Sequence, residues 1–203
     1  MSGQKLRAAT RGTALALEQT RIVTDALRGK FAGVEFEIIE VSSDGDRDQK
    51  TILWDLKGRG FFTSRVEQVL VEGGADFAVH SLKDLPADDS EGLEVRAIFK
   101  RDYARDCVAA GAGVRCIGDL KRGAVVGTSS LRRKSQILAM RRDLQVKPVR
   151  GNVPTRVGLV ESGEVDAVIL ARAGLERLGL GEKISFVLEG SKFLPAAGQG
   201  ALA

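Results

Sequence analysis

The sequence is poor in the residues on which several protein classes depend. Its 203 residues include two cysteines and one histidine, and aromatic residues make up only 5%. Two cysteines are too few for a disulfide framework or a zinc site. A lone His80 is a poor basis for a Ser-His-Asp hydrolase. So few aromatic side chains provide little surface on which nucleic-acid bases could stack. No apolar run approaches the roughly 18 residues that span a bilayer, and the first residues lack the apolar core of a signal peptide. We therefore expect a cytoplasmic protein that uses no metal, no nucleic acid and no membrane.

The charge and the apolar content describe an ordinary globular chain. Lys plus Arg number 31 and Asp plus Glu number 27, so the net charge is +4, and the two signs are mixed along the chain. Hydrophobic residues make up 43%, which is enough to bury a core without covalent staples. The length suggests one large domain or two small ones.

Strand-like and helix-like segments alternate along the chain, which predicts an α/β fold with mostly parallel sheets. In the first helix we expect Leu15, Leu17, Ile22, Ala26 and Leu27 to face inward, and in the second Val66, Val69 and Leu70. A charged stretch near 100–105 marks a boundary between two lobes that face a cleft. The expected strands are 6–9, 34–41, 77–79, 93–99, 124–126, 144–149 and 167–170. The expected helices are 14–27, 62–72, one that the turn 127–130 opens and that runs through Met140, one with Pro154 near its first turn, and 173–178.

Hydroxyl and guanidinium side chains recur just after the predicted strands. In open α/β sheets, ligands bind outside the carboxyl ends of the strands, and helix N-termini and arginines there favour anions. The pattern therefore predicts a small polyanion as ligand, although any one arginine could equally solvate a helix surface. The residues in these positions are Arg11, Thr13, Ser81, Lys83, Thr128, Ser129, Ser130, Arg132, Arg133, Arg150, Arg156 and Arg177.

Asp84 is the one acid in this set. A carboxylate weakens an anion site, so it could serve proton transfer or stabilise a developing cation. It could equally cap a helix or pair with Lys83, and spacing leaves the two interpretations even. Of the other candidates, Cys107 has the apolar neighbours of a core residue, and His80 is interpreted as structural. Phe62 follows a glycine-rich segment and belongs to a lid or to the core.

Seven segments together resemble the porphobilinogen deaminase (hydroxymethylbilane synthase) family. The most specific are His80-Ser81-Leu82-Lys83-Asp84 and Gly127-Thr128-Ser129-Ser130-Leu131-Arg132-Arg133. The others are Ala9-Thr10-Arg11 with Ala14-Leu15-Ala16-Leu17, Gly58-Arg59-Gly60-Phe61-Phe62, Arg150-Gly151-Asn152-Val153 with Thr155-Arg156, Ala173-Gly174-Leu175 with Arg177-Leu178-Gly179, and Leu194-Pro195-Ala196-Ala197-Gly198-Gln199-Gly200-Ala201.

The resemblance implies a transferase of heme and tetrapyrrole biosynthesis. The family joins four porphobilinogen molecules head to tail, releases ammonia each time, and thereby makes a polyanionic oligopyrrole. By resemblance, Asp84 contacts the pyrrole nitrogens, assists proton transfer and stabilises the cation-like azafulvene, while the hydroxyls and cations named above hold carboxylates. Gln19 and Gln199 would line the cleft, Phe62 would stack over it, and Thr13 and Arg59 stand where the family usually has Ser and Lys.

The resemblance also implies the architecture and the cofactor. The family has two lobes that resemble type II periplasmic binding proteins, here 1–100 with 195–203 returning toward it and 101–194, and it is usually monomeric. A third domain carries the cysteine that binds a dipyrromethane cofactor, and neither Cys107 nor Cys116 matches it. We therefore expect a chain without that domain, with three alternatives: a fragment of an authentic deaminase, a binding module for pyrroles or other small polycarboxylates, or a protein that works with a separate third domain.

Overall fold

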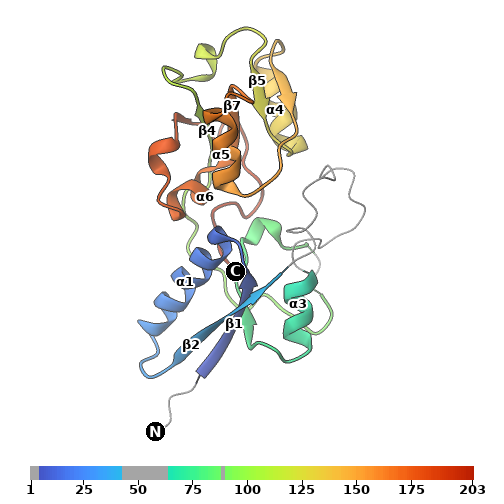
Figure 1. Cartoon of the computed structure of the whole chain (residues 1–203). Coiled ribbons are helices and arrows are strands. Elements are labelled where there is room, and N and C mark those ends of the chain that lie inside the picture. Colours follow the sequence, from blue (N-terminus) through green and yellow to red (C-terminus); the bar gives the residue numbers. More distant parts are fainter. Residues whose placement is uncertain (1–4, 43–63, 88–89) are drawn as a thin grey trace. The chain divides into compact units, whose positions relative to one another are not determined.

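The computed structural model describes residues 5–42, 64–87 and 90–203, which form two compact α/β units (Figure 1). Unit 1 contains the described residues up to 101 together with 201–203, and unit 2 contains residues 102–200. The predicted site residues Arg59 and Phe62, and the start of the predicted helix 62–72, lie outside the described residues.

Unit 1 is built on a three-stranded parallel sheet of order β2-β1-β3. Its strands are β1 (Lys5–Arg11), β2 (Glu35–Val41) and β3 (Phe77–Ala78), and its helices are α1 (Ala14–Arg28), α3 (Ser64–Val71) and the short 3-10 helix η2 (Leu82–Asp84). Helices α1 and α3 cover opposite faces of this sheet (Figure 1). As predicted, Val66, Val69 and Leu70 of α3 face inward, where they pack against Ala9 and Val41.

Helix α1 buries only part of the predicted face, including Leu27, which packs against the core. Ile22 is 37% exposed and Ala26 is also exposed, whereas Thr20 and Thr24 are fully buried. Both threonine hydroxyls donate to backbone carbonyls of their own helix, at Ala16 (2.9 Å) and Arg21 (3.1 Å). Because these hydrogen bonds satisfy the hydroxyls, the threonines can face the core at little cost, and the apolar periodicity alone was misleading.

The prediction of a strand over residues 93–99 is wrong. The segment is irregular, and its Val95 and Ile98 are 44% and 60% exposed. Phe99 N–H donates to the Leu202 carbonyl (2.8 Å). Among the described residues, this segment forms no other backbone hydrogen bond to a distant part of the sequence. An alternating apolar pattern becomes a strand only when a neighbouring strand satisfies its backbone groups.

Unit 2 contains a five-stranded mixed sheet of order β6-β5-β7-β4-β8. Strands β5, β6 and β7 are parallel, and β4 runs antiparallel to both β7 and β8. The strands are β4 (Asp106–Ala110), β5 (Val125–Gly127), β6 (Gln145–Lys147), β7 (Ala167–Ala171) and β8 (Phe186–Val187). The helices are α4 (Leu131–Met140), α5 (Val153–Glu161) and α6 (Arg172–Arg177), with 3-10 helices η3 (Ile117–Asp119) and η4 (Gly181–Lys183).

Two apolar layers sandwich this sheet. Ile137 of α4 packs with Val126 and Ile169 on one face, and Val157 of α5 and Leu175 of α6 pack with Val168 on the other. The predicted α/β class with mostly parallel sheets is therefore confirmed, but β4 was not predicted and reverses the direction of the sheet. That reversal matters for the site, because it brings the first residue of β4 to the edge where β7 ends.

Candidate functional site

The candidate site of unit 2 lies at the carboxyl edge of its parallel strands. Strand β5 leads into Thr128-Ser129-Ser130, β6 leads to Arg150, and β7 leads into α6. At the same edge, Asp106 pairs with Ala171 in the antiparallel register of β4 and β7. Four strands therefore contribute polar residues to one edge, where sheets of this kind bind ligands.

The three hydroxyls after β5 hold the loop in shape. The Thr128 hydroxyl accepts a hydrogen bond from Ser130 N–H (3.2 Å), and the Ser130 hydroxyl caps α4 by accepting from Arg133 N–H (3.4 Å). The buried Ser129 hydroxyl accepts from Val149 N–H (2.9 Å) and donates to the Val149 carbonyl. These hydrogen bonds fix the start of α4, where unpaired N–H groups favour an anion.

Arg132 and Arg133 share one buried carboxylate, that of Asp106, which is fully inaccessible to solvent. Arg133 donates from Nε (3.2 Å) and Nη2 (2.7 Å) to Oδ1, and from Nη1 to the Ile169 carbonyl (3.2 Å). Nη1 of Arg132 lies 2.8 Å from Oδ2 of Asp106. Burial opposes ionisation of Asp106, but the two guanidinium groups outweigh it and hold the pKa of this carboxyl below its usual value.

The same pair of arginines is not equivalent. Arg133 is buried, with all three of its guanidinium nitrogens engaged inside unit 2. Arg132 is half-buried, and its Nη1 contacts Asp106 and the Leu194 carbonyl. Among the described residues, Nε and Nη2 of Arg132 have no hydrogen-bond partner, so they remain available to a ligand.

Arg156 is a cation without a carboxylate partner in the described part of the chain. Its Nε donates to the Gly151 carbonyl (2.8 Å). Burial, followed by repulsion from Arg133 and Arg150, lowers the pKa of Arg156 to about 10. Burying a cation without a counter-ion is costly, so binding of an external anion near Arg156 is favoured. Arg150, the source of part of that repulsion, is half-buried.

Arg177 and Gln199 lie beside the segment that leads into β4. Arg177 is half-buried and donates from Nη2 to the Gly200 carbonyl (2.7 Å), and burial lowers its pKa. Gln199 is buried and donates from Nε2 to the Ala104 carbonyl and to Oδ1 of Asp106, both at 2.9 Å. Asp106 thus accepts from two predicted site residues, Arg133 and Gln199, and forms an ion pair with a third, Arg132.

Asp106 was missed by sequence reasoning, which considered only the residues that follow strands. In a parallel sheet those residues share one edge, but an antiparallel strand brings its first residue to that edge instead. The available signal was an acid that directly begins an apolar run, Asp106 before Cys107-Val108-Ala109. A charged residue inside a buried strand is rarely found without a partner.

Unit 1 carries the remaining predicted residues. Arg11 ends β1 and is half-buried, and Thr13 caps α1 by accepting from Ala16 N–H (3.4 Å). The buried Gln19 donates from Nε2 to the Ser81 hydroxyl (2.9 Å), which donates back to Oε1 of Gln19 (3.2 Å). Thr13, Gln19 and Ser81 therefore support the local structure around the carboxyl ends of β1 and β3.

Asp84 is an exposed carboxylate on η2, directly after the half-buried Lys83. Its N–H donates to the carbonyl of Ser81 (2.9 Å), the N-cap residue of η2, whose side chain Gln19 contacts. The Asp84 side chain is neither a cap nor a member of an ion pair in the described residues. Its carboxylate is thus open to a ligand.

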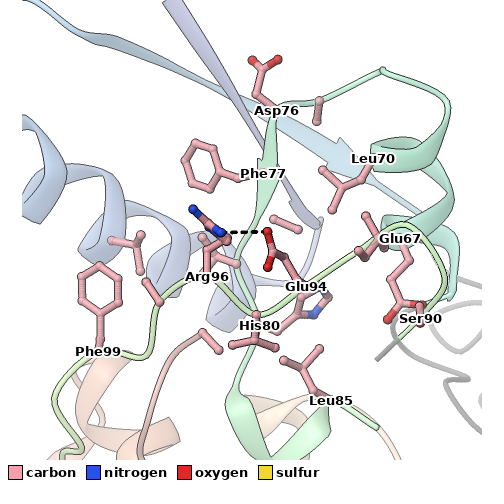
Figure 2. Close-up of a pocket in the computed structure, with 18 of the residues that line it drawn as sticks. Glu67, Leu70, Asp76, Phe77, His80, Leu85, Ser90, Glu94, Arg96 and Phe99 are labelled. Carbon is pink, nitrogen blue, oxygen red and sulfur yellow. Dashed lines mark hydrogen bonds and ion pairs between the residues drawn. The ribbon is translucent and has the colours of Figure 1, made fainter. Parts of the chain in front are cut away.

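Unit 1 also contains a cavity of about 480 Å³, which is distinct from these residues (Figure 2). Its walls are mainly apolar, and its charged lining residues are Glu67, Asp76, Glu94 and Arg96. Three acids against one cation do not suit a polyanion. His80 borders the cavity, its Nε2 has no partner within the described residues, and burial lowers its pKa. The predicted anion-binding residues are absent from the lining.

Comparison with known proteins identifies the family. Residues 6–203 match the family model "Porphobilinogen deaminase, dipyromethane cofactor binding domain". The chain belongs to the porphobilinogen deaminase family. It is 44% identical over 199 residues to a porphobilinogen deaminase of Maridesulfovibrio salexigens, covering 98% of this chain and 64% of that protein. It is 46% identical over 199 residues to one of Brevibacillus brevis, with the same two coverages. The chain therefore spans slightly less than two thirds of the relatives it matches.

Solved structures confirm the two-lobe fold class. A TRAP periplasmic solute binding protein from Desulfovibrio salexigens matches 99% of this chain and 65% of its own, with a TM-score of 0.53 and 13% identity. The L-cystine solute receptor of Neisseria gonorrhoeae matches 99% and 79%, with a TM-score of 0.50 and 18% identity. At these identities the likeness concerns the fold alone. No helix among the described residues is long and apolar enough to cross a membrane, and within the same residues no cluster of three metal-binding side chains occurs.

The porphobilinogen deaminase family uses a dipyrromethane cofactor, and part of this chain fits such a group. Arg132, Arg150 and Arg156 suit its carboxylates, because Arg132 and Arg156 retain nitrogens without a protein partner in the described region. The two thiols do not suit a covalent attachment. Cys107 is fully buried, and Cys116 is the N-cap of η3, which carries none of the anion-binding residues.

The two cysteines should differ sharply in reactivity. Burial raises the pKa of Cys107 to about 12, whereas Cys116 is exposed. Because the thiolate is the nucleophile, iodoacetamide at pH 8 is expected to label Cys116 within minutes and Cys107 only after unfolding. Intact-protein mass spectrometry before and after denaturation measures this. Native Cys116→Ser protein should remain unlabelled, and rapid labelling of that variant would contradict the assignment.

Proposed function

We propose that this chain contributes the substrate-binding and catalytic residues of a porphobilinogen deaminase. In this reaction, four porphobilinogen molecules condense head to tail with release of ammonia to give hydroxymethylbilane. The observation that carries the proposal is the excess of half-buried positive charge at the carboxyl edge of the unit 2 sheet, with Arg156 as its clearest member. Each pyrrole carries an acetate and a propionate, so an oligopyrrole supplies the carboxylates that this charge requires.

Arginines serve this purpose better than lysines. A guanidinium group offers parallel N–H donors to both oxygens of a carboxylate. In our proposal, Arg132, Arg150 and Arg156 bind pyrrole carboxylates in unit 2, and the N-terminus of α4 adds unpaired N–H groups. Arg11 and Lys83 of unit 1 do the same for carboxylates that reach the ends of β1 and β3. The hydroxyls of Thr128, Ser129 and Ser130 act by fixing the loop.

Asp84 takes the catalytic role in this proposal. Loss of ammonia from porphobilinogen leaves a cation-like azafulvene, and a nearby carboxylate stabilises such charge and can relay protons from pyrrole nitrogens. The side chain is exposed on η2, whose start is held by the Gln19–Ser81 pair. Lys83 next to it binds a substrate carboxylate and so keeps the pyrrole within reach.

Partners and compartment follow from the same proposal. The protein acts on porphobilinogen and the growing oligopyrrole, as a monomer, in the cytoplasm, without nucleic acid or membrane. Both cysteines are free thiols, which is the usual state in a reducing compartment.

The test is turnover by wild type and by its Asp84→Asn variant, each in a chain that includes the cofactor-bearing third domain of the family. Wild type is expected to consume porphobilinogen, to release ammonia and to form a tetrapyrrole product that mass spectrometry identifies. Asp84→Asn should lower turnover by about 10²–10⁴-fold, the usual contribution of a proton-transferring group, while porphobilinogen affinity by calorimetry changes less than about threefold.

Glu91→Gln is the matched control, since Glu91 is also an exposed carboxylate of unit 1 and the substitution removes the same charge. Its turnover should equal that of wild type. Reversible binding by wild type without any turnover would support a binding module instead of an enzyme, and near-normal turnover of Asp84→Asn would remove Asp84 from the mechanism.

A further inference from the structure

We propose that Asp106 is a positioning residue that sets the geometry of the unit 2 anion site through Arg132. This inference rests on the proposed function and adds to it a residue that does not itself touch the substrate. Asp106 is fully buried, begins β4, and contacts three of the predicted site residues, Arg132, Arg133 and Gln199.

The presence of an acid here requires an explanation, because its charge opposes the binding of anions. A buried ion pair gains little net stability over a well-packed apolar pair. Asp106 with Arg133 alone would form a neutral pair. Asp106 with both arginines leaves one net positive charge, and that charge resides on Arg132, the more exposed of the two.

The two arginines differ in the number of guanidinium nitrogens that contact the rest of unit 2. Arg133 directs Nε and Nη2 to Asp106 and Nη1 to the Ile169 carbonyl, so it is an internal brace between α4 and the sheet. Arg132 is held at one nitrogen only, Nη1, between Oδ2 of Asp106 and the Leu194 carbonyl. Holding one nitrogen orients the plane of the guanidinium group and presents its other edge, Nε and Nη2, to a carboxylate.

Gln199 links this brace to the segment that precedes β4. Its Nε2 donates to both Oδ1 of Asp106 and the Ala104 carbonyl. The carboxylate therefore receives donors from α4 and from the segment after η4, and its position is defined from several sides. Preorganisation of this kind lowers the entropic cost of binding, because the side chain is already ordered.

The sign of the change in affinity separates positioning from simple electrostatics. Asp106→Asn removes one negative charge, so a purely electrostatic role predicts tighter anion binding. A positioning role predicts weaker binding, because the amide repels one guanidinium donor and Arg132 loses its orientation. We expect porphobilinogen affinity, measured by calorimetry on the purified chain, to fall about tenfold. Asp143→Asn, which removes the same charge from an ion pair with Arg141, should leave it unchanged.

A double-mutant cycle tests whether Asp106 acts through Arg132. In an Arg132→Gln background, Asp106→Asn should have no further effect on affinity, so the two changes are non-additive. Additive losses would mean that Asp106 acts by another route, and tighter binding by Asp106→Asn would overturn the proposal.

A measurement on wild type covers the case in which Asp106→Asn does not fold. In arginine Nε–Hε NMR spectra, added porphobilinogen should shift the Arg132 signal and leave the Arg133 signal in place. Equal shifts of both signals would overturn the division of roles. Benzene-1,3,5-tricarboxylate serves as a second probe: if it binds but porphobilinogen does not, the proposed function fails while the Asp106 comparison remains readable. A wild-type chain that binds neither probe overturns both proposals.

Discussion

Replacing Gly200 with alanine is expected to destabilise the protein more than any other single methyl group added to unit 2. Gly200 has φ +94°, and a Cβ there would lie 2.1 Å from the Asp102 carbonyl oxygen. The backbone fixes the position of the Cβ, and the carbonyl is itself backbone, so neither can rotate away and the chain must shift. The same residues are joined by a hydrogen bond from Asp102 N–H to the Gly200 carbonyl (3.1 Å), which a shift would break. We expect a loss of about 4 kcal/mol or more in the free energy of unfolding.

Gly163→Ala is the matched control for this substitution. Gly163 has a similar φ of +74°, but no atom lies within 4 Å of its Cβ position. The free energy of unfolding of this variant should fall by only about 1–2 kcal/mol, which is the cost of placing an L-residue in the left-handed region. Urea unfolding followed by circular dichroism measures both values. Equal losses for the two variants would show that backbone conformation, and not the approach to Asp102, limits position 200.

Arg156→Gln is expected to weaken polycarboxylate binding and to stabilise the unliganded protein. Burial and repulsion from Arg133 and Arg150 oppose the charge of Arg156, whose pKa falls to about 10. Removing that charge should raise the free energy of unfolding by about 1–2 kcal/mol. Porphobilinogen affinity should fall at least about tenfold, because a charge-assisted bidentate contact is lost.

Arg122→Gln controls for the change in net charge, since Arg122 is exposed in the same unit. It should alter neither stability nor affinity beyond about a few tenths of a kcal/mol. Calorimetric titration and thermal unfolding of all three proteins provide the measurements. A destabilised Arg156→Gln variant would mean that the contacts of Arg156 within the protein outweigh the cost of burying its charge. That result would contradict the proposal that Arg156 favours an external anion.

Arg156→Gln is expected to raise stability and to lower affinity, and these opposite changes are a general feature of binding sites. A group that is unfavourable in the free protein but favourable with ligand costs stability and adds affinity. Asp106 has a different role, since its buried carboxylate forms ion pairs with Arg132 and Arg133. Some hydroxyls that the sequence assigns to the ligand, such as that of Ser129, form hydrogen bonds that shape the loop carrying these charges.

The sequence by itself determined the elements and the family. Most of the predicted strands and helices were found within a few residues, because alternation, capping residues such as Thr13 and Ser130, and glycine at Gly29 are local signals. The segments around Lys83-Asp84 and Arg132-Arg133 indicated the porphobilinogen deaminase family before any fold was available. Arg59 and Phe62 stay predictions, since they lie outside the described residues.

Only the tertiary structure decided which charges are used internally and which face a ligand. Arg132 and Arg133 are neighbours with the same chemistry, yet one braces the core and the other presents its nitrogens, because the reversed strand β4 brings Asp106 beside them. The segment 93–99 has the pattern of a strand, but pattern cannot supply a partner strand. Pairing across the sheet joins residues far apart in sequence, and a single sequence carries no local record of such contacts.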